Sequence, residues 1–393
     1  MTEHRKTGDV TRYRTYLPDE NGKRDKVIAK GSLREVENVL IEFYQSKHLD
    51  NIPTVGKVYA QWVAYHHKLN NSSPNTIDKY ITDYERFIKG KPIESMHITE
   101  VQDTDIEDYF LDAITTYVGR NGRRGLQYKP FGKLYGYFEG VFKYAYRHRI
   151  IEKNPMWYLD KKDFRNACRP PEEKTAETEL ISDDVFDLIL KQLYKDIEEN
   201  PTNFTFYAVE FAAKTALRVG EVATLKWSDI NYNGGYIEIS RSDKYHRIRD
   251  ESGKIIGHEW VIERTKTKKN RRFPIDDCIT TSLNRIRKAQ MSNNCASEWI
   301  FPHPEFGWTH SNLISSCIKN KCKQLKLGRT YGIHALRKTL NSDMRNDNAS
   351  SKLCSSMLGN SPEVNDKYYY YDNSDMDLKR SYVENAHAKR AYM

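Results

Sequence analysis

Apolar residues recur at helical spacing through residues 54–160. Val55, Tyr59, Trp62 and Val63 follow an i, i+4, i+7, i+8 pattern, which places them on one face of a helix. A second helical run, which ends before Asn154-Pro155, carries its apolar side chains at Leu134, Phe138, Val141, Phe142 and Ala145. Apolar faces of this kind must be buried against other helices. We therefore predict a small all-helical domain over residues 54–160.

Short strand patterns precede this domain. Residues 12–17 (RYRTYL) and 26–29 predict two strands, and the Pro18–Gly22 segment between them predicts a turn. Ser32 is a suitable N-cap for an amphipathic helix that runs to Tyr44, with residues 45–53 as a linker. A sheet this small buries little apolar area by itself. Residues 1–50 are therefore interpreted as a ββα-like recognition module.

The largest predicted domain covers residues 175–393. A charged, proline-containing linker over residues 165–178 leads into it, and Ser182 is expected to cap its first long helix. The pattern then predicts helices at 204–217 and 221–227, strands at 236–240, 260–264 and 272–275, and helices to the end. This order predicts a mainly helical α+β domain.

Charge changes the picture by indicating a polyanionic partner. The 393 residues contain 63 Lys and Arg against 54 Asp and Glu, a net charge of +9. The excess gathers in short stretches: residues 318–338 contain Lys and Arg but no acid, and residues 120–149 contain one acid, Glu139. The candidate DNA-binding residues of the latter stretch are Arg120, Arg123, Arg124, Lys129, Lys133 and Arg147. Solvated helix faces explain each stretch taken alone, whereas their combination favours nucleic acid.

Several function classes lack their usual signatures. No run of 18 apolar residues occurs, and the first ten residues lack the apolar segment of a signal peptide. We therefore expect a cytoplasmic chain that does not enter a membrane. The six cysteines are scattered without a CxxC pair, and neither HExxH nor GxxxxGK[ST] occurs. We accordingly expect reduced cysteines, no metal site, no cofactor, and cleavage that proceeds without a divalent ion.

Four segments carry candidate chemistry. Arg218 follows an apolar helix in ALRVGE, where a buried charge needs an anionic partner such as Glu221 or a substrate phosphate. His334 and Arg337 lie three residues apart in IHALRKT, on one helix face. The basic segment ERTKTKKNRRFPI predicts a hairpin with a turn near 268–270, and its cations are Lys266, Lys268, Lys269, Arg271 and Arg272. Finally, Asn360 precedes four consecutive tyrosines, residues 368–371.

Together these residue types describe phosphoryl transfer. Two arginines can bind the non-bridging oxygens of a phosphodiester and stabilise the charge of its transition state. A lysine or histidine can protonate the leaving 5′-oxygen, and a tyrosine hydroxyl among cations becomes a competent nucleophile. The segments and their order resemble the tyrosine recombinase family of phage-type and conjugative-transposon integrases. The matching stretches are ALRVGEVATLKWSDI, TKTKKNRRFPI, HALRKT, LGNS with NDKYYYYD, and FEGVFKYAYRHRIIEKNP.

The resemblance implies a role for each matched residue. Arg218 and Arg337 would bind the scissile phosphate, Lys266 would be the general acid, and His334 would act as a base or hydrogen-bond partner. Glu221 would support the site from behind. Asn360 stands where the family usually has His or Trp; it can donate a hydrogen bond but cannot shuttle a proton. The family's nine-residue spacing from Asn360 gives Tyr369 as nucleophile, and a ten-residue spacing gives Tyr370.

The resemblance also implies the architecture and the reaction. The expected fold is multidomain: residues 1–50 an arm-type DNA-binding module, 54–160 an all-α core-binding domain, and 175–393 the catalytic domain with a C-terminal tail. The expected enzyme is an integrase that recombines double-stranded DNA at attachment sites through a 3′-phosphotyrosyl intermediate. Its expected partners are other copies in a tetramer on DNA, and an excisionase or host DNA-bending factor. A catalytically impaired DNA-binding relative and a type IB topoisomerase-like enzyme are the alternatives.

Overall fold

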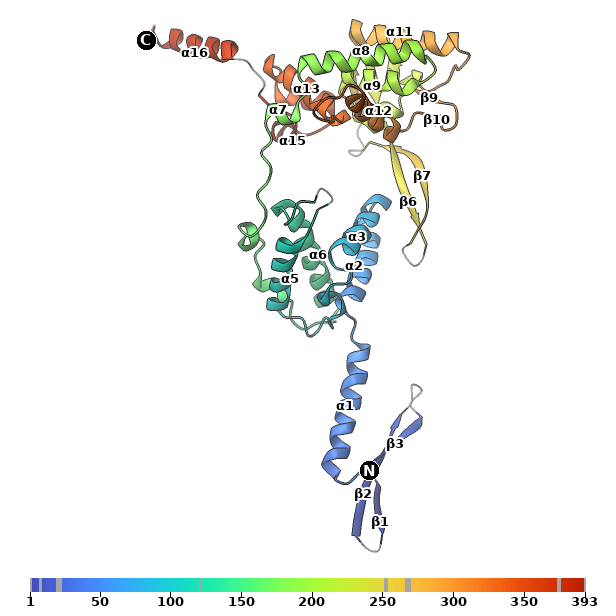
Figure 1. Ribbon diagram of the computed structural model, residues 1–393, viewed down its shortest axis with the longest axis vertical. Coiled ribbons are helices and arrows are strands. Elements are labelled where there is room, and N and C mark those ends of the chain that lie inside the picture. The colour runs from blue at the N-terminus through green and yellow to red at the C-terminus, as the bar shows by residue number, and fades with distance from the viewer. Residues whose placement is uncertain are drawn as a thin grey trace. The chain divides into compact units, whose positions relative to one another are not determined.

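The computed structural model describes residues 2–6, 9–18, 23–119, 122–250, 254–265, 270–372 and 376–391. The chain forms two compact units, Met1–Glu172 and Glu173–Met393, here called the N-terminal and C-terminal units (Figure 1). Its helices outnumber its short strands, in agreement with the predicted mainly helical, multidomain fold class. Among the described residues, no helix has both the length and the apolar character needed to span a membrane.

The N-terminal unit begins with an antiparallel sheet of order β1-β2-β3 followed by a helix. The strands are β1 (Thr2–Lys6), β2 (Asp9–Pro18) and β3 (Arg24–Lys30), and the helix is α1 (Leu33–Asn51). Leu17, Ile28 and Val36 are buried in this segment. The sequence predicted two strands; β1 is additional, because its residues TEHRK carry no apolar alternation. Helix α1 also continues through most of the predicted linker, where neither glycine nor proline interrupts it before Pro53.

The rest of the N-terminal unit is helical, as the sequence predicted. Its helices are α2 (Val55–Asn70), α3 (Pro74–Phe87), α4 (Pro92–Ser95), α5 (Asp103–Thr116) and α6 (Tyr128–Arg147), followed by short 3₁₀ turns at Pro155–Tyr158 and Asp163–Arg165. The predicted apolar faces of α2 and α6 lie in one aromatic-rich core. Gly140 permits their close packing, since a Cβ there would lie 2.7 Å from the ring of Trp62.

Helix α9 (Phe204–Thr215) forms the centre of the C-terminal unit. The helices that contact it are α8 (Asp183–Glu199), α10 (Val219–Ala223), α11 (Asp277–Ser292), α12 (Ser311–Gln324) and α13 (Ile333–Asn346) (Figure 1). Ser182 occupies the N-cap of α8 as predicted, although its side chain makes no capping hydrogen bond. The predicted helix at 221–227 is shorter than expected: α10 ends at Ala223, and a 3₁₀ turn follows at Trp227–Asp229. The remaining helices are α7 (Ala176–Glu179), α14 (Ser351–Leu358), α15 (Pro362–Tyr368) and α16 (Met376–Ala391).

The strands of the C-terminal unit pair differently from the prediction. Strands β4 (Ile230–Asn231), β5 (Tyr236–Ile239) and β8 (Arg271–Pro274) form one antiparallel sheet, and β6 (Arg241–Arg249) pairs with β7 (Ile255–Arg264) in a separate ribbon. A short pair, β9 (Pro302–His303) and β10 (Gly307–Trp308), completes the strands. The two strands that flank the basic segment therefore do not form one hairpin. Pairing β8 with β5 instead buries Phe273 opposite Ile237. Burial of these two apolar side chains favours this pairing over a hairpin of β7 and β8.

Candidate active site

The arginine clamp, defined here as Arg218 and Arg337, is assembled at the start of α10. Ala216 adopts a left-handed conformation (φ +49°) that ends α9 and turns the chain toward Arg218, the N-cap residue of α10. The carboxylate of Glu221 accepts hydrogen bonds from the Arg218 backbone N–H at 2.9 Å and from its Nη1 at 3.0 Å. This local capping box places a buried negative charge directly behind the Arg218 guanidinium, whose side chain stays 30% exposed.

Arg337 on α13 is the second guanidinium of the clamp and is fully buried. Its Nη1 donates to the carbonyl of Ala216 at 2.7 Å, and its Nη2 donates to the carbonyl of Leu358 at 2.6 Å. Burial, together with the positive charge of Arg218, lowers the pKa of Arg337 to about 10. The guanidinium therefore still carries its positive charge at neutral pH. Its buried Nε has no hydrogen-bond partner among the described residues.

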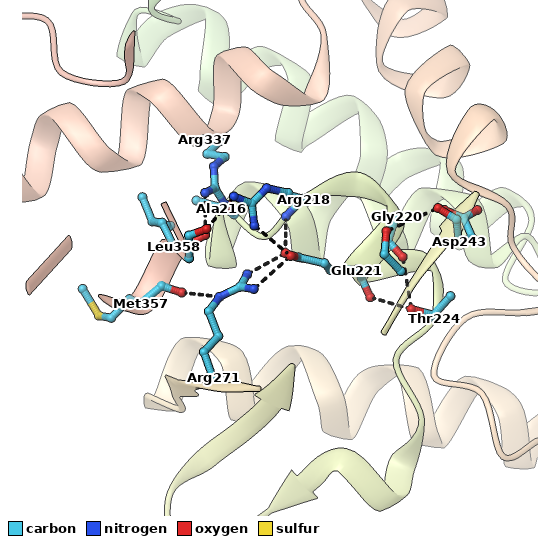
Figure 2. A network of polar contacts seen from close by, with 12 residues as sticks. Ala216, Arg218, Gly220, Glu221, Thr224, Asp243, Arg271, Arg337, Met357 and Leu358 are labelled. Carbon is cyan, nitrogen blue, oxygen red and sulfur yellow. Dashed lines mark hydrogen bonds and ion pairs between the residues drawn. The ribbon is translucent and has the colours of Figure 1, made fainter. Parts of the chain in front are cut away.

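Three arginines bind three consecutive carbonyls at the end of α14, and Figure 2 labels two of the carbonyl residues, Met357 and Leu358. The carbonyls belong to Met357, Leu358 and Gly359, and their donors are, in order, Arg271 Nε at 2.8 Å, Arg337 Nη2 at 2.6 Å and Arg218 Nη2 at 2.7 Å. Carbonyls at a helix C-terminus lack partners within the helix and carry its partial negative charge. The carbonyls at the end of α14 therefore offset the repulsion among the three guanidinium groups.

His334 and Tyr369 lie beside the clamp. The ring centroids of His334 and Tyr369 are 6.4 Å apart, and the Arg337 guanidinium lies 5.1 Å from the Tyr369 ring centroid. Desolvation by neighbouring protein atoms lowers the pKa of His334 even though the residue is exposed, and the positive charge of Arg337 lowers it further. The neutral form of His334 is thereby favoured at physiological pH.

The four tyrosines each face a different cation. Helix α15 ends at Tyr368, so the run is not one continuous helix, and the carbonyl of Tyr369 accepts hydrogen bonds from Asn341 Nδ2 at 3.1 Å and Ser342 Oγ at 3.3 Å. The cations opposite Tyr368, Tyr369, Tyr370 and Tyr371 are Lys367, Arg337, Arg345 and Lys338. Tyr369 is therefore the tyrosine of this run that lies against an arginine of the clamp.

Asn360 follows the turn at Gly359. Both polar atoms of its side chain, Oδ1 and Nδ2, are buried without a hydrogen-bond partner among the described residues. An unpaired buried amide costs free energy of roughly 1–3 kcal/mol. This is a reason to expect that a ligand pairs with Asn360.

The remaining predicted DNA-binding and catalytic residues differ in their surroundings, and some of them are not described by the structure. Arg120, Lys266, Lys268 and Lys269 lie outside the described residues. Arg272 stacks 4.3 Å from the ring centroid of Tyr236. In the N-terminal unit Arg123 pairs with Glu172 and Arg124 donates to the carbonyl of Thr115, while Lys133 and Arg147 are exposed on α6; Lys129 also lies on α6.

Arg271, a predicted DNA contact, is bonded within the protein. The side chain of Arg271 is only 9% exposed, and its three nitrogens donate to Glu221 and to the carbonyl of Met357. These intramolecular bonds occupy the guanidinium, which therefore does not present a free face to DNA. Sequence reasoning also missed Asn341 and Ser342, which hold the Tyr369 backbone; they follow Arg337 by about one helical turn, and that spacing was the available signal.

Comparisons with known proteins match the stretch of chain that contains this site. Residues 188–375 match the phage integrase family model. A tyrosine recombinase XerC-like protein from Caldanaerobacter subterraneus subsp. tengcongensis is 24% identical over 318 residues, which cover 78% of this chain and 76% of that protein.

Two solved structures share the fold. The Tn1549 transposon integrase in complex with transposon right end DNA has a TM-score of 0.61 at 17% identity, covering 85% of this chain and 99% of that one. A lambda integrase tetramer bound to a Holliday junction has a TM-score of 0.56 at 17% identity, covering 90% and 96%. The solved structures show the fold alone. The arginine clamp and the neighbouring tyrosine lie within residues 188–375, which match the phage integrase family model, and with the XerC-like relative they identify the chain as a tyrosine recombinase, an enzyme of site-specific recombination.

Proposed function

We propose that this chain cleaves and rejoins double-stranded DNA at attachment sites through a covalent 3′-phosphotyrosyl intermediate on Tyr369. One observation carries the proposal: Tyr369 lies against Arg337, and Arg337 and Arg218 donate to adjacent carbonyls of the same turn. Three segments far apart in sequence thus supply a nucleophile and two cations at one place. This is the minimum that phosphodiester cleavage by a tyrosine requires.

The clamp would bind the non-bridging oxygens of the scissile phosphate. Arg218 has an exposed face, whereas the Tyr369 ring lies against Arg337, which is fully buried. Phosphate binding to Arg337 therefore requires the Tyr369 ring to move off the guanidinium.

In the cleavage step the Tyr369 oxygen forms a bond to phosphorus and the bond to the 5′-oxygen breaks. His334, held in its neutral form, would accept the phenol proton or hold it by a hydrogen bond. Lys266 would protonate the leaving 5′-oxygen, a role that rests on the sequence resemblance. Attack by the 5′-hydroxyl of a partner strand reverses these bond changes and releases Tyr369, so the ester conserves the bond energy.

Asn360 would donate its amide N–H to a phosphate oxygen. Its two buried polar atoms, which lack a partner among the described residues, support this assignment because a phosphate oxygen would remove the cost of a missing hydrogen bond. An amide group does not ionise near neutral pH, so it cannot act as a general acid or base. Asn360 would therefore bind the phosphate without taking part in proton transfer.

The other parts of the chain would organise DNA and copies of the protein. We propose residues 1–50 as an arm-type module for a second DNA sequence, 54–160 as the core-binding domain and 175–393 as the catalytic domain. Lys133 and Arg147, exposed on α6, are suited to phosphate contacts. An assembly of four copies on DNA would supply the active sites that exchange of two duplexes needs, and an excisionase or DNA-bending host factor would direct it.

Helix α16 is proposed to dock on a neighbouring copy. Its apolar side chains are exposed, with Met376 at 71% and Val383 at 53%. Its contacts with its own unit include Tyr382 Oη to Asn348 Oδ1 and Lys379 to Asp372. Deleting residues 376–393 should therefore weaken two-site complexes by about tenfold or more while single-site binding stays within about twofold, measured by gel shift. Unchanged assembly of two-site complexes would contradict this role.

A suicide substrate tests the proposed reaction. A nicked attachment site releases a short 5′-hydroxyl fragment after cleavage, so religation is lost and the covalent adduct accumulates. The full chain should form an adduct that survives denaturing electrophoresis and maps to Tyr369. Stable binding without any adduct would instead favour a catalytically impaired DNA-binding protein.

A further inference from the structure

Arg271 is the most fully engaged arginine near the clamp. Its Nη1 lies 2.9 Å from Glu221 Oε1, its Nη2 lies 2.5 Å from Glu221 Oε2, and its Nε donates to the carbonyl of Met357 at 2.8 Å (Figure 2). The pair of parallel bonds to one carboxylate fixes the orientation of both groups. Arg271 thus joins β8 to α10 and to the end of α14.

Glu221 divides its carboxylate between two arginines. The same two oxygens also accept hydrogen bonds from the backbone N–H and Nη1 of Arg218. Glu221 is only 2% exposed, so its charge depends on both guanidinium groups. If Arg271 were absent, Arg218 would be the only cation among the described residues that is bonded to this carboxylate. A guanidinium drawn more strongly to Glu221 would be less available to a phosphate.

The turn that leads to Asn360 also rests on Arg271. Gly359 has a φ of +71°, and a Cβ at this position would lie 2.9 Å from both Cδ and Nη1 of Arg271. The Arg271 side chain therefore packs directly beneath the glycine whose carbonyl binds Arg218. Both partners of Arg218, the Glu221 carboxylate and the Gly359 carbonyl, are held in place by one side chain.

We infer that Arg271 is a positioning residue of the recombination site: it holds Glu221 and the end of α14 so that the open face of Arg218 meets the scissile phosphate. This inference rests on the proposed function. It replaces the interpretation of Arg271 as a DNA contact. Arg271 also begins the strand that follows the basic segment containing Lys266, so the same side chain fixes the point at which that segment rejoins the domain core.

The inference has a pH signature. Burial by itself would raise the pKa of Glu221, but hydrogen bonds and charge from Arg271, followed by the charge of Arg218, hold that pKa below its ordinary value. Weakening the Arg271 contact raises the pKa of Glu221, so the carboxylate takes up a proton as the pH falls. A protonated Glu221 no longer orients Arg218. The loss of cleavage should therefore grow toward low pH. A general loss of folding stability would lower the amount of folded protein, but it would not change the rate of adduct formation by protein that is already bound to DNA.

The experiment compares Arg271→Lys and Arg271→Met with Arg285→Lys in the full chain. Arg285 pairs with buried Glu210 in the same unit but away from the clamp, so its variant reports the cost of disrupting a buried ion pair. We measure affinity for attachment-site DNA and the single-turnover rate of adduct formation on a suicide substrate between pH 6 and 8.5. Both Arg271 variants should bind DNA within about twofold of wild type and form adduct at least about tenfold more slowly at pH 8. The deficit should be larger at pH 6, whereas Arg285→Lys should keep the wild-type profile.

Two results would overturn the inference. Wild-type adduct rates in Arg271→Lys would show that the Glu221 contact is not needed, and a loss of DNA affinity with a smaller salt dependence would assign Arg271 to the DNA surface. An Arg271→Met chain that fails to fold leaves the decision to Arg271→Lys, which keeps the positive charge. Failure of the wild-type chain to form any adduct would be a failure of the proposed function and would be seen before any variant is compared.

Discussion

Tyr369→Phe is expected to reduce covalent adduct formation by at least about a thousandfold, because the variant lacks the oxygen that bonds to phosphorus. The phenylalanine ring keeps the packing against Arg337, whose guanidinium lies 5.1 Å from the ring centroid. The hydrogen bonds from the side chains of Asn341 and Ser342 to the backbone carbonyl of residue 369 also remain. Folding and non-covalent DNA binding should therefore be unchanged, as measured by thermal melting and gel shift beside the suicide-substrate assay.

The neighbouring tyrosines supply matched controls for this variant. Tyr368 faces Lys367, Tyr370 faces Arg345 and Tyr371 faces Lys338, each at 5.1–5.6 Å from cation to ring centroid. Phenylalanine at each of these positions removes the same hydroxyl group and should leave adduct formation within about threefold of wild type. Adduct mapped by peptide sequencing to Tyr370, or adduct that persists in Tyr369→Phe, would show that another tyrosine attacks.

Arg218→Lys should lower the cleavage rate by about a hundredfold to a thousandfold while DNA affinity falls by less than about threefold. Arg218 donates to Glu221 and to the carbonyl of Gly359 while keeping one face exposed. A lysine ammonium carries the same charge but cannot reach both partners and still bind two phosphate oxygens in a plane. Because many other cations contact the DNA backbone, the loss should appear in the chemical step.

Arg241→Lys is the control for Arg218→Lys. Arg241 has a similar side-chain exposure, 28% against 30%, and binds the carboxylate of Asp229 and the carbonyl of Thr224 in the same unit. Its variant should retain cleavage within about twofold. Equal losses of binding and cleavage in Arg218→Lys would show instead that Arg218 belongs to the general basic surface.

The sequence by itself was enough for features that depend on local spacing. Apolar side chains at Val55, Tyr59 and Trp62 predict the buried face of α2, because a helix repeats every 3.6 residues whatever its surroundings. His334 and Arg337 were placed on one helix face by the same rule. Glu221 was offered as a partner of Arg218 because a buried charge needs an opposite charge nearby, and the two are hydrogen-bonded. Local rules failed where the local signal was weak: charged β1 has no apolar alternation, and α15 ends at Tyr368 instead of continuing through Tyr371.

Only the tertiary structure decided how the distant segments meet. Backbone carbonyls of residues 357–359 bind three arginines, and a carbonyl is the same in every residue, so no sequence pattern marks it. Pairing β8 with β5 turned Arg271 from an expected DNA contact into the partner of Glu221, 50 residues away in sequence. Tyr369 likewise differs from its three neighbours through its tertiary surroundings, because its ring lies against Arg337 and near His334. These contacts depend on long-range packing, in which burial, charge and strand register are balanced over the whole unit. Such packing produces no periodic pattern in the sequence from which the contacts could be predicted.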